Sequence, residues 1–324
     1  MTKTVRIYEV GGPEVLRVED VELPAPGPGE ALVRHAAVGL NFIDTYHRSG
    51  LYKVGLPTSL GIEAAGVVEA VGSDVTEVRP GDRVAYAGGP LGAYSQARVM
   101  PSRVLVPLPE GITEAQAAAA MLKGMTAQYL LRRTHRVEAG ETILVHAAAG
   151  GVGLIMCQWA RHLGATVIGT VGSETKAALA AEHGCHHPVV YTREDFVARV
   201  RELTGGRGVP VVYDSVGRST WEGSLDCLSP LGLMVSFGNA SGPVEPFAPT
   251  VLAAKGSLFL TRPSLAAYTA SREDLLAAAR DLFEVMLSGA VGVEVGQSFP
   301  LVDAAEAHRA LQARRTVGST LLLP

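Results

Sequence analysis

A glycine-rich turn between a strand-like run and a helix limits the fold of this chain more than any other motif. The run Thr142–His146 is apolar and β-branched, and the turn Ala147–Gly153 follows it directly. A helical stretch then begins at about Val152. Strand, glycine turn and helix in this order are typical of the first unit of a dinucleotide-binding fold.

The turn fits the dinucleotide fingerprint in the form A-x-G-x-x-G, with Ala148 where the first glycine usually stands. Gly150, with Gly151 beside it, lets a pyrophosphate approach the backbone, and Gly153 lets helix and strand pack closely. The helix start at Val152 offers unpaired N–H groups and the positive end of the helix dipole. The sequence therefore predicts a dinucleotide site. The alternative interpretation is a tight strand–helix turn without a ligand.

Strand-like and helical runs alternate from about residue 125 to residue 265. This alternation with buried apolar strands predicts an α/β fold with a Rossmann-type, doubly wound parallel sheet. The runs are Thr142–His146, helix 152–163, Thr166–Val171, helix 174–183, Val189–Tyr191, helix 194–203, Val209–Asp214, helix 219–228 and Leu233–Phe237.

The two ends of the chain read differently, and together they predict a second, β-rich domain. Residues 1–124 contain short apolar runs separated by Gly/Pro punctuation. Residues 266–324 contain a helical segment, Arg272–Ser288, followed by a strand–helix–strand pattern that ends at Thr320–Leu323. We therefore expect a β-rich domain from 1–124 and 266–324, and a dinucleotide-binding domain at 125–265.

Composition excludes several other classes of protein. The net charge is −4, so the chain has no basic field for a nucleic-acid backbone, and nucleic-acid binding is not expected. Three isolated cysteines do not form a disulfide scaffold and favour a reducing compartment. Residues 142–160 carry no charge, but their glycines favour strand, turn and buried helix over a membrane span. No secretory signal is visible, so we expect a cytoplasmic protein without a membrane segment.

The cofactor's identity depends on the turn after the second strand of the parallel sheet. An NAD site usually places an acid there, whereas this chain has Gly172 followed by Ser173. Lys176 lies one helical turn further on, and a hydroxyl with a cation suits a 2′-phosphate. Glu174 does not fit a phosphate site unless it points to solvent, which we assume. The pattern predicts NADPH, with an ordinary solvated helix start as the alternative.

Motifs spread along the whole chain carry a family resemblance. They are 38–44 (VGLNFID) with Tyr46 and 50–52 (GLY), 61–66 (GIEAAG), 80–84 (PGDRV), 123–127 (KGMTA), 147–153, 213–217 (YDSVG) and 237–239 (FGN). Together they are far more specific than any one alone. The chain resembles the quinone oxidoreductase (zeta-crystallin-like) branch of the medium-chain dehydrogenase/reductase superfamily.

The resemblance implies a GroES-like β-rich domain and NADPH-dependent reduction of a planar quinone by hydride transfer. An enone or alkenal double-bond reductase on the same scaffold is the alternative activity. A non-enzymatic protein that binds NADPH or RNA is a further alternative. The resemblance also implies a homodimer, paired through the late apolar strand Ser257–Thr261.

The zinc ligands of the alcohol dehydrogenases in this superfamily have no counterparts here. Their catalytic Cys and His positions resemble Asn41 and Ile62, which cannot replace a thiolate and an imidazole. The four-cysteine structural zinc loop is also missing. The cluster His183–His187 is read as a surface turn with weak metal affinity. No metal is therefore expected.

Candidate site residues follow in part from position and in part from the resemblance. Asn41, Tyr46 and Tyr52 are the candidate catalytic residues, and Asn41 also belongs to the expected cofactor contacts. Tyr191 and Arg314 are expected at the 2′-phosphate, with Arg315 as the competitor of Arg314. The remaining expected cofactor contacts are Thr126, Ser215, Phe237, Gly238, Asn239 and Arg262. Asp44 and Asp214 are interpreted as structural acids that bind backbone N–H groups.

Overall fold

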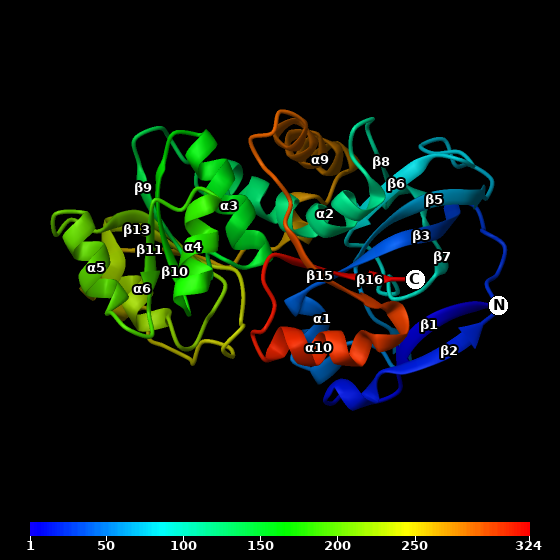
Figure 1. Ribbon diagram of the computed structural model, residues 1–324, viewed down its shortest axis with the longest axis horizontal. Coiled ribbons are helices and arrows are strands. Elements are labelled where there is room, and N and C mark those ends of the chain that lie inside the picture. Colours follow the sequence, from blue (N-terminus) through cyan, green and yellow to red (C-terminus); the bar gives the residue numbers. More distant parts are fainter. The chain divides into compact units, whose positions relative to one another are not determined.

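The computed structural model describes residues 1–324, which divide into two compact units (Figure 1). The β-rich unit comprises Met1–Met125, Thr269–Leu287 and Val293–Pro324. The parallel-sheet unit comprises Thr126–Tyr268 and Ser288–Gly292. Both chain ends therefore lie in the β-rich unit. Residues 266–268 and 288–292, which were expected in the β-rich domain, group with the parallel sheet, and Met125 groups with the β-rich unit.

Six parallel strands form one sheet in the order β11-β10-β9-β12-β13-β14. They are β9 (Thr142–Val145), β10 (Thr166–Val171), β11 (His187–Val190), β12 (Val209–Asp214), β13 (Leu228–Ser236) and β14 (Phe259–Thr261). The chain builds outward from β9 to β11 and then from β12 to β14, so the strand order reverses between β9 and β12. This confirms the predicted Rossmann-type doubly wound sheet.

Helices cover the parallel sheet in two packed pairs. Helices α3 and α4 contact each other and strands β9, β10 and β11, whereas α5 and α6 contact each other and strands β11, β12 and β13. Trp221 packs in the core with Leu144, Ile168, Val212 and Met234. Burial of each such side chain contributes about 1.5–3 kcal/mol. The helices are α3 (Gly151–His162), α4 (Glu174–Glu182), α5 (Phe196–Leu203), α6 (Trp221–Cys227), α7 (Thr250–Ala254) and α8 (Leu265–Tyr268).

The β-rich unit holds two sheets. One has the order β2-β1-β4, and the other runs β15-β16-β3-β5-β6-β8 with β7 also paired to β3. Strand β16 pairs antiparallel with β3, which joins the C-terminal end of the chain to its N-terminal part. The strands are β1 (Thr2–Ile7), β2 (Arg17–Val21), β3 (Glu30–Leu40), β4 (Thr58–Ser59), β5 (Glu63–Val71), β6 (Arg83–Ala87), β7 (Ala97–Pro101), β8 (Val106–Pro107), β15 (Val295–Pro300) and β16 (Ser319–Leu323).

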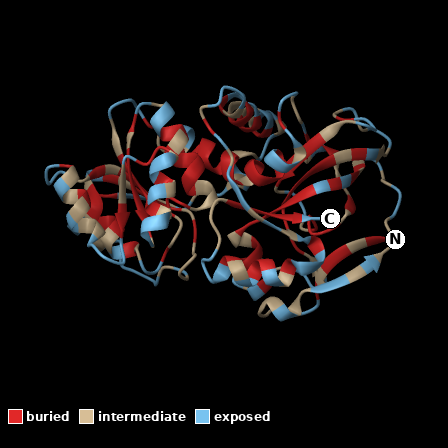
Figure 2. Cartoon of the chain, in the orientation of Figure 1, coloured by how far each residue is buried: buried red, intermediate tan, exposed pale blue.

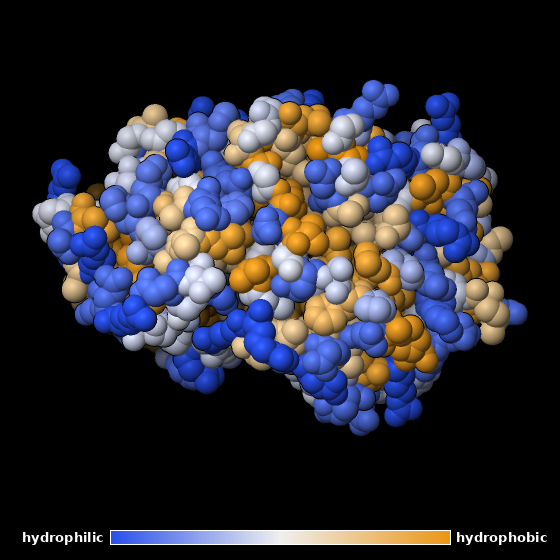
Figure 3. Space-filling model, in the orientation of Figure 1, coloured by the Kyte–Doolittle hydropathy of each residue, from blue (hydrophilic) through white to orange (hydrophobic).

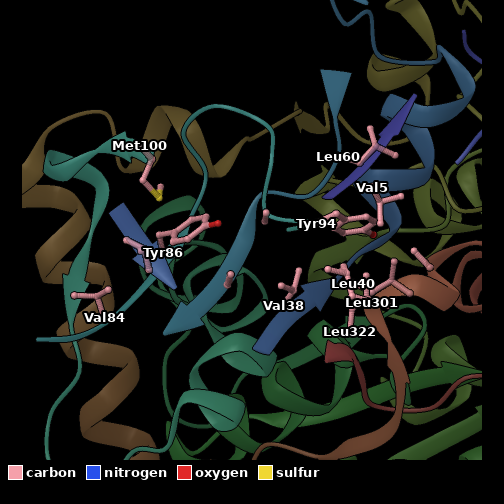
Figure 4. Packing of buried hydrophobic residues seen from close by; sticks show 14 of the residues in the cluster. Val5, Val38, Leu40, Leu60, Val84, Tyr86, Tyr94, Met100, Leu301 and Leu322 are labelled. Atoms are coloured by element: carbon pink, nitrogen blue, oxygen red, sulfur yellow. The ribbon is translucent and has the colours of Figure 1, made fainter. Parts of the chain in front are cut away.

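The inner residues of these sheets form a continuous apolar core, seen as red ribbon in Figure 2. Two fully buried tyrosines belong to it, Tyr86 on β6 and Tyr94 before β7. Figure 4 shows Tyr94 near Leu40 and Leu301, while Tyr86 lies near Met100. A buried tyrosine needs a partner for its hydroxyl, and both have one, as described below.

Four helices belong wholly or mainly to the β-rich unit: α1 (Phe42–Ser49), α2 (Glu114–Tyr129), α9 (Arg272–Leu287) and α10 (Ala304–Gln312). The sequence analysis expected neither α1 nor α2. Helix α1 is a single short element between the N-cap Asn41 and Gly50, whose φ of +81° ends it. Helix α2 contains the fully buried run 117–121, so it lacks the polar face that makes a helix recognisable by its periodicity.

Strand β14 is shorter than the sequence analysis predicted. The expected strand was Ser257–Thr261, whereas the structure pairs only Phe259–Thr261 with β13. Ser257 has a φ of +56°, which is incompatible with an extended strand. The strand therefore begins two residues later than its apolar pattern suggests.

No helix of the protein combines the length and apolarity needed to cross a membrane. The uncharged segment 142–160 divides into strand β9, a glycine turn and most of helix α3, as predicted. On the face drawn in Figure 3, apolar side chains are scattered among hydrophilic ones.

Candidate active site

The glycine turn after β9 is built by close backbone packing. A Cβ atom on Gly153 would lie 2.3 Å from the carbonyl oxygen of Ala147, so only glycine fits there. Ala148 stands at the usual first glycine, and Gly169 of β10 makes room for it, since a Cβ on Gly169 would lie 2.6 Å from the Ala148 Cβ. The alanine variant of the fingerprint is thus accommodated by a glycine in the next strand.

Helix α3 starts directly from this turn. Gly150 is its N-cap, Gly151 and Val152 are its first residues, and no side chain caps the first N–H groups. The first turn holds no acidic residue. A set of uncapped N–H groups at the positive end of a helix dipole is suited to a phosphate.

The turn after β10 leads into helix α4. Ser173 is the N-cap, and its hydroxyl oxygen accepts from the backbone N–H of Lys176 at 3.3 Å. Glu174 is exposed and forms an ion pair with Arg193 at 2.6 Å, which confirms that it points away into solvent. The hydroxyl of Tyr191 lies over Gly172, where an added Cβ would approach it to 2.9 Å. The hydroxyls of Ser173 and Tyr191 therefore lie at this turn, and Lys176 follows in the first turn of α4.

The loops after β12 and β13 pack on each other. Asp214 accepts from the N–H groups of Val216 at 2.7 Å and Gly217 at 2.9 Å, which confirms its structural role. Gly238 packs against Ser215, whose carbonyl oxygen would lie 2.3 Å from a Cβ at that position. The expected contacts Ser215, Phe237, Gly238 and Asn239 therefore form one loop pair.

Arg262, just after β14, holds this loop pair from the side. Its guanidinium donates to the carbonyl oxygens of Ser236 at 3.0 Å and Gly238 at 3.1 Å. The Asn239 side-chain oxygen accepts a further hydrogen bond from Arg262 at 3.0 Å. Arg262 thus supports the loop shape through the backbone.

A buried histidine network, which the sequence analysis missed, lies beneath the glycine turn. His146 bonds through Nδ1 to Thr170 at 2.8 Å and through Nε2 to Ser224 at 2.9 Å. Ser224 in turn donates to Asp214 at 2.9 Å. Burial lowers the pKa of His146, which keeps the ring neutral. The network ties β9, β10, β12 and α6 together at the carboxyl ends of the strands, where ligands of such sheets bind.

In the β-rich unit, Asn41 is tied to a buried ion pair. Its side-chain amide donates to the Glu63 carboxylate at 2.7 Å, and Lys123 donates to the same carboxylate at 3.1 Å. The other Glu63 oxygen accepts from the backbone N–H of Leu122 at 2.6 Å. Glu63 is fully buried and Lys123 is nearly so. Glu63 and Lys123 lie in the resembling motifs 61–66 and 123–127, but their pairing had no signal in the sequence.

Tyr46 and Tyr52 meet edge to face, with ring centroids 5.3 Å apart. Tyr46 lies on helix α1 and is buried, whereas Tyr52 is partly exposed in the following turn. The backbone N–H of Tyr52 donates to the carbonyl of Tyr46 at 3.1 Å. Asn41, Tyr46 and Tyr52 are therefore grouped around one helix, as the candidate catalytic set requires.

The remaining candidates lie apart from these groups in the sequence. Thr126 begins the parallel-sheet unit and hydrogen-bonds to Tyr129 in helix α2. Arg314, in the β-rich unit, has a left-handed backbone with a φ of +56°. Arg315 forms a 3.8 Å ion pair with Glu306.

The residues around Asn41 do not fit a zinc ion. The Asn41 amide and the Lys123 ammonium both donate to Glu63, and Ile62 supplies only an apolar side chain. Nowhere in residues 1–324 do three His, Cys, Asp or Glu side chains gather as a metal site. In the His183–His187 turn, His183 bonds to the Leu179 carbonyl and His186 accepts from the backbone of β10. This donor chemistry does not provide the thiolate and imidazole set of a catalytic zinc.

Comparisons with known proteins agree with these features. An alcohol dehydrogenase GroES-like domain model matches residues 27–110, and a zinc-binding dehydrogenase model matches residues 151–280. The quinone oxidoreductase of Pseudomonas aeruginosa is 57% identical, with both chains fully covered. The Burkholderia 2-haloacrylate reductase is 47% identical over 100% of this chain and 99% of its own.

Among solved structures, the Escherichia coli quinone oxidoreductase complexed with NADPH superposes with a TM-score of 0.98. It is 50% identical, and the match covers 99% of this chain and 100% of that one. Full-length similarity of this degree, together with the doubly wound sheet and the glycine turn, settles the family. The chain belongs to the quinone oxidoreductase family of the medium-chain dehydrogenase/reductase superfamily.

Proposed function

We propose that this protein reduces quinones with NADPH by hydride transfer and without zinc. The observation that carries the proposal is full-length similarity to quinone oxidoreductases, one of them solved with NADPH, joined to a glycine turn that suits a phosphate. Bound NADPH supplies the hydride. The protein's part is to hold the cofactor, orient the acceptor and exclude water.

The cofactor contacts of the proposal come from loops after the parallel strands. Gly150, Gly151, Val152 and Gly153 receive the pyrophosphate at the start of helix α3. Gly172, Ser173, Lys176 and Tyr191 receive the 2′-phosphate, with Arg314 as a further cation. Thr126, Ser215, Phe237, Gly238, Asn239 and Arg262 are assigned to the ribose and nicotinamide side. The support is the absence of an acid in the first turn of α3 and the outward orientation of Glu174.

The acceptor side is assigned to Asn41, Tyr46 and Tyr52. Their grouping around α1 offers aromatic surface, hydroxyl groups and an amide, which suit a planar molecule with ring oxygens. A quinone accepts a hydride with little Lewis-acid assistance. It therefore matches a donor set that does not suit zinc.

A second candidate activity is reduction of an activated double bond. The 47% identity to a 2-haloacrylate reductase favours this activity, because the name of that relative gives a substrate with an activated double bond. Steady-state kinetics with NADPH and either 1,4-benzoquinone or a panel of enones and 2-haloacrylates separate the two. We expect the higher kcat/KM with the quinone. A clear preference for the enone or haloacrylate would replace the quinone assignment.

We further propose a cytoplasmic homodimer that pairs through β14. This strand pairs with β13 alone in the single chain, so its other edge is open. Phe259 is 60% exposed and Leu260 is 37% exposed on this edge. An open apolar edge strand is normally covered by a partner. The free cysteines Cys157, Cys185 and Cys227 support a reducing compartment.

A further inference from the structure

A chain of four buried polar side chains connects helix α10 with the start of helix α1. Arg48 Nη1 lies 3.0 Å from His308 Nδ1, and His308 Nε2 lies 2.9 Å from the Tyr94 hydroxyl. The Tyr94 hydroxyl lies 3.0 Å from Asp44 Oδ2. Each of the four side chains is almost completely buried. Figure 4 shows Tyr94 among the apolar side chains of Val5, Leu40 and Leu301.

The hydrogen bonds of this chain all run in one direction. A guanidinium has no acceptor, so Arg48 donates and His308 Nδ1 accepts. His308 Nε2 therefore carries the proton and donates to Tyr94, whose single hydroxyl proton goes to Asp44. Burial and the Arg48 charge lower the pKa of His308 to about 3, so this one tautomer of the neutral ring persists at neutral pH.

The Asp44 end of the chain reaches the candidate catalytic set. Asp44 Oδ2 accepts from the backbone N–H of Asn41 at 2.9 Å as well as from Tyr94. Asp44 is the third residue of helix α1, which begins after Asn41 and carries Tyr46. The carboxylate thus fixes the turn from which both side chains project.

The other end of this hydrogen-bonded chain is Arg48, which lies in the last turn of α1 and bonds to partners outside that helix. Arg48 donates from Nε to the carbonyl oxygen of Gly11 at 3.1 Å and from Nη2 to Gln312 Oε1 at 3.1 Å. His308 and Gln312 both belong to helix α10. Tyr94 therefore holds the start of α1 through Asp44, and helix α10 holds its last turn through Arg48.

We propose that Tyr94 and His308 are positioning residues for quinone reduction, because they hold Asp44 as the acceptor that orients Asn41 and helix α1. This inference rests on the proposed function. Neither Tyr94 nor His308 is placed against the quinone; both act through Asp44. The apolar core around them keeps water from replacing the missing bond when one member is removed.

Asp44 makes the proposal measurable through pH. Burial raises the pKa of Asp44 to about 7, and the hydrogen bonds from Asn41 and Tyr94 oppose this rise. Glu63 on β5 raises the pKa further and Lys123 on α2 lowers it, while Arg48 and His308 reach Asp44 through Tyr94. Removal of the Tyr94 hydroxyl should therefore raise the pKa of Asp44 by about one unit or more.

The test compares Tyr94→Phe with Tyr86→Phe. Tyr86 is equally buried in the same core, and its hydroxyl bonds to His35 at 3.0 Å, a partner outside the candidate site. With saturating NADPH, wild-type kcat/KM for 1,4-benzoquinone should fall as pH drops below about 7. In Tyr94→Phe this fall should start about one pH unit higher, and in Tyr86→Phe it should not move.

His308 provides a rescue test of the same chain. His308→Leu should shift the pH profile as Tyr94→Phe does. His308→Gln should restore it, since an amide can accept from Arg48 and donate to Tyr94.

The outcomes separate this proposal from the proposed function. A wild-type protein that does not reduce the quinone overturns both. An active wild-type protein whose pH profile stays unmoved in Tyr94→Phe and His308→Leu overturns the positioning role alone. Equal shifts in Tyr94→Phe and Tyr86→Phe would also overturn it, because they would reflect a general loss of packing.

Discussion

The side-chain amide of Asn41 donates to the carboxylate of Glu63 at 2.7 Å, and the ammonium of Lys123 occupies the same carboxylate at 3.1 Å. A position that resembles a zinc ligand in related dehydrogenases is thus held by a hydrogen-bonded amide beside a buried ion pair. The cation in this region is a lysine of the chain itself. The same hydrogen bond that holds the Asn41 side chain therefore occupies the position where a zinc ligand would stand.

Loss of the Glu63 charge should destabilise the protein strongly. Glu63→Gln leaves Lys123 buried without its carboxylate, and breaking a buried pair in this way costs about 3–5 kcal/mol. Urea unfolding of the variant measures the change in the free energy of unfolding. Glu69→Gln is the matched control on the same strand β5, since Glu69 pairs with Arg34 at the surface. The Glu69→Gln substitution should lower the free energy of unfolding by no more than about 1 kcal/mol. Equal losses would show that the buried pair has no special weight.

Purified protein should contain no stoichiometric zinc. The residues around Asn41 offer an amide and an isoleucine in place of thiolate and imidazole, and such donors do not hold the ion. Elemental analysis checks the content, and activity after treatment with a chelator checks the consequence. About one tightly held zinc per chain, or activity lost to the chelator, would contradict the expectation.

Lys176→Ala should weaken NADPH binding by roughly tenfold to a hundredfold, as expected for loss of a charge-assisted hydrogen bond worth about 1.5–3 kcal/mol. NADH binding should remain nearly unchanged, because NADH has no 2′-phosphate. The helix cap should survive, since Ser173 accepts from the backbone N–H of residue 176. Fluorescence titration with both cofactors measures the two affinities. If both fell equally, the assignment of Lys176 to the 2′-phosphate would be wrong.

The protein should be a dimer at micromolar concentration. Phe259→Asp would place a charge on the exposed edge of β14 and should release monomers, because the pairing surface would lose its apolar character. Light scattering gives the mass of both forms. Val18→Asp, on the exposed surface of β2, serves as a control that should keep the dimer. A monomeric wild type would end the proposal.

Sequence reasoning went furthest where local patterns have a single interpretation. The parallel strands followed from continuous apolar runs, and the glycine turn at Gly150 and Gly153 followed from the fingerprint. The backbone role of Asp214 was also predicted from its place beside a loop, whereas the solvent orientation of Glu174 was assumed and is confirmed by its exposure.

Contacts between distant segments had no such signal. Glu63 meets Lys123 across 60 residues, and Tyr94 meets His308 across 214. Helix α2 escaped notice because its buried alanines show no polar face. Strand β14 was predicted too long, because the apolar pattern gives no sign of the left-handed backbone at Ser257. These features depend on tertiary packing between distant segments, and neighbouring residues in a single sequence give no sign of such contacts.

The decisive measurement is the oxidation of NADPH and of NADH, followed side by side with and without 1,4-benzoquinone. We expect rapid loss of NADPH only when the quinone is present, with a markedly higher kcat/KM than for NADH. We expect the same rates after treatment of the enzyme with a chelator. Quinone-independent or absent NADPH oxidation, or a preference for NADH, would show that the protein is not an NADPH-dependent quinone reductase.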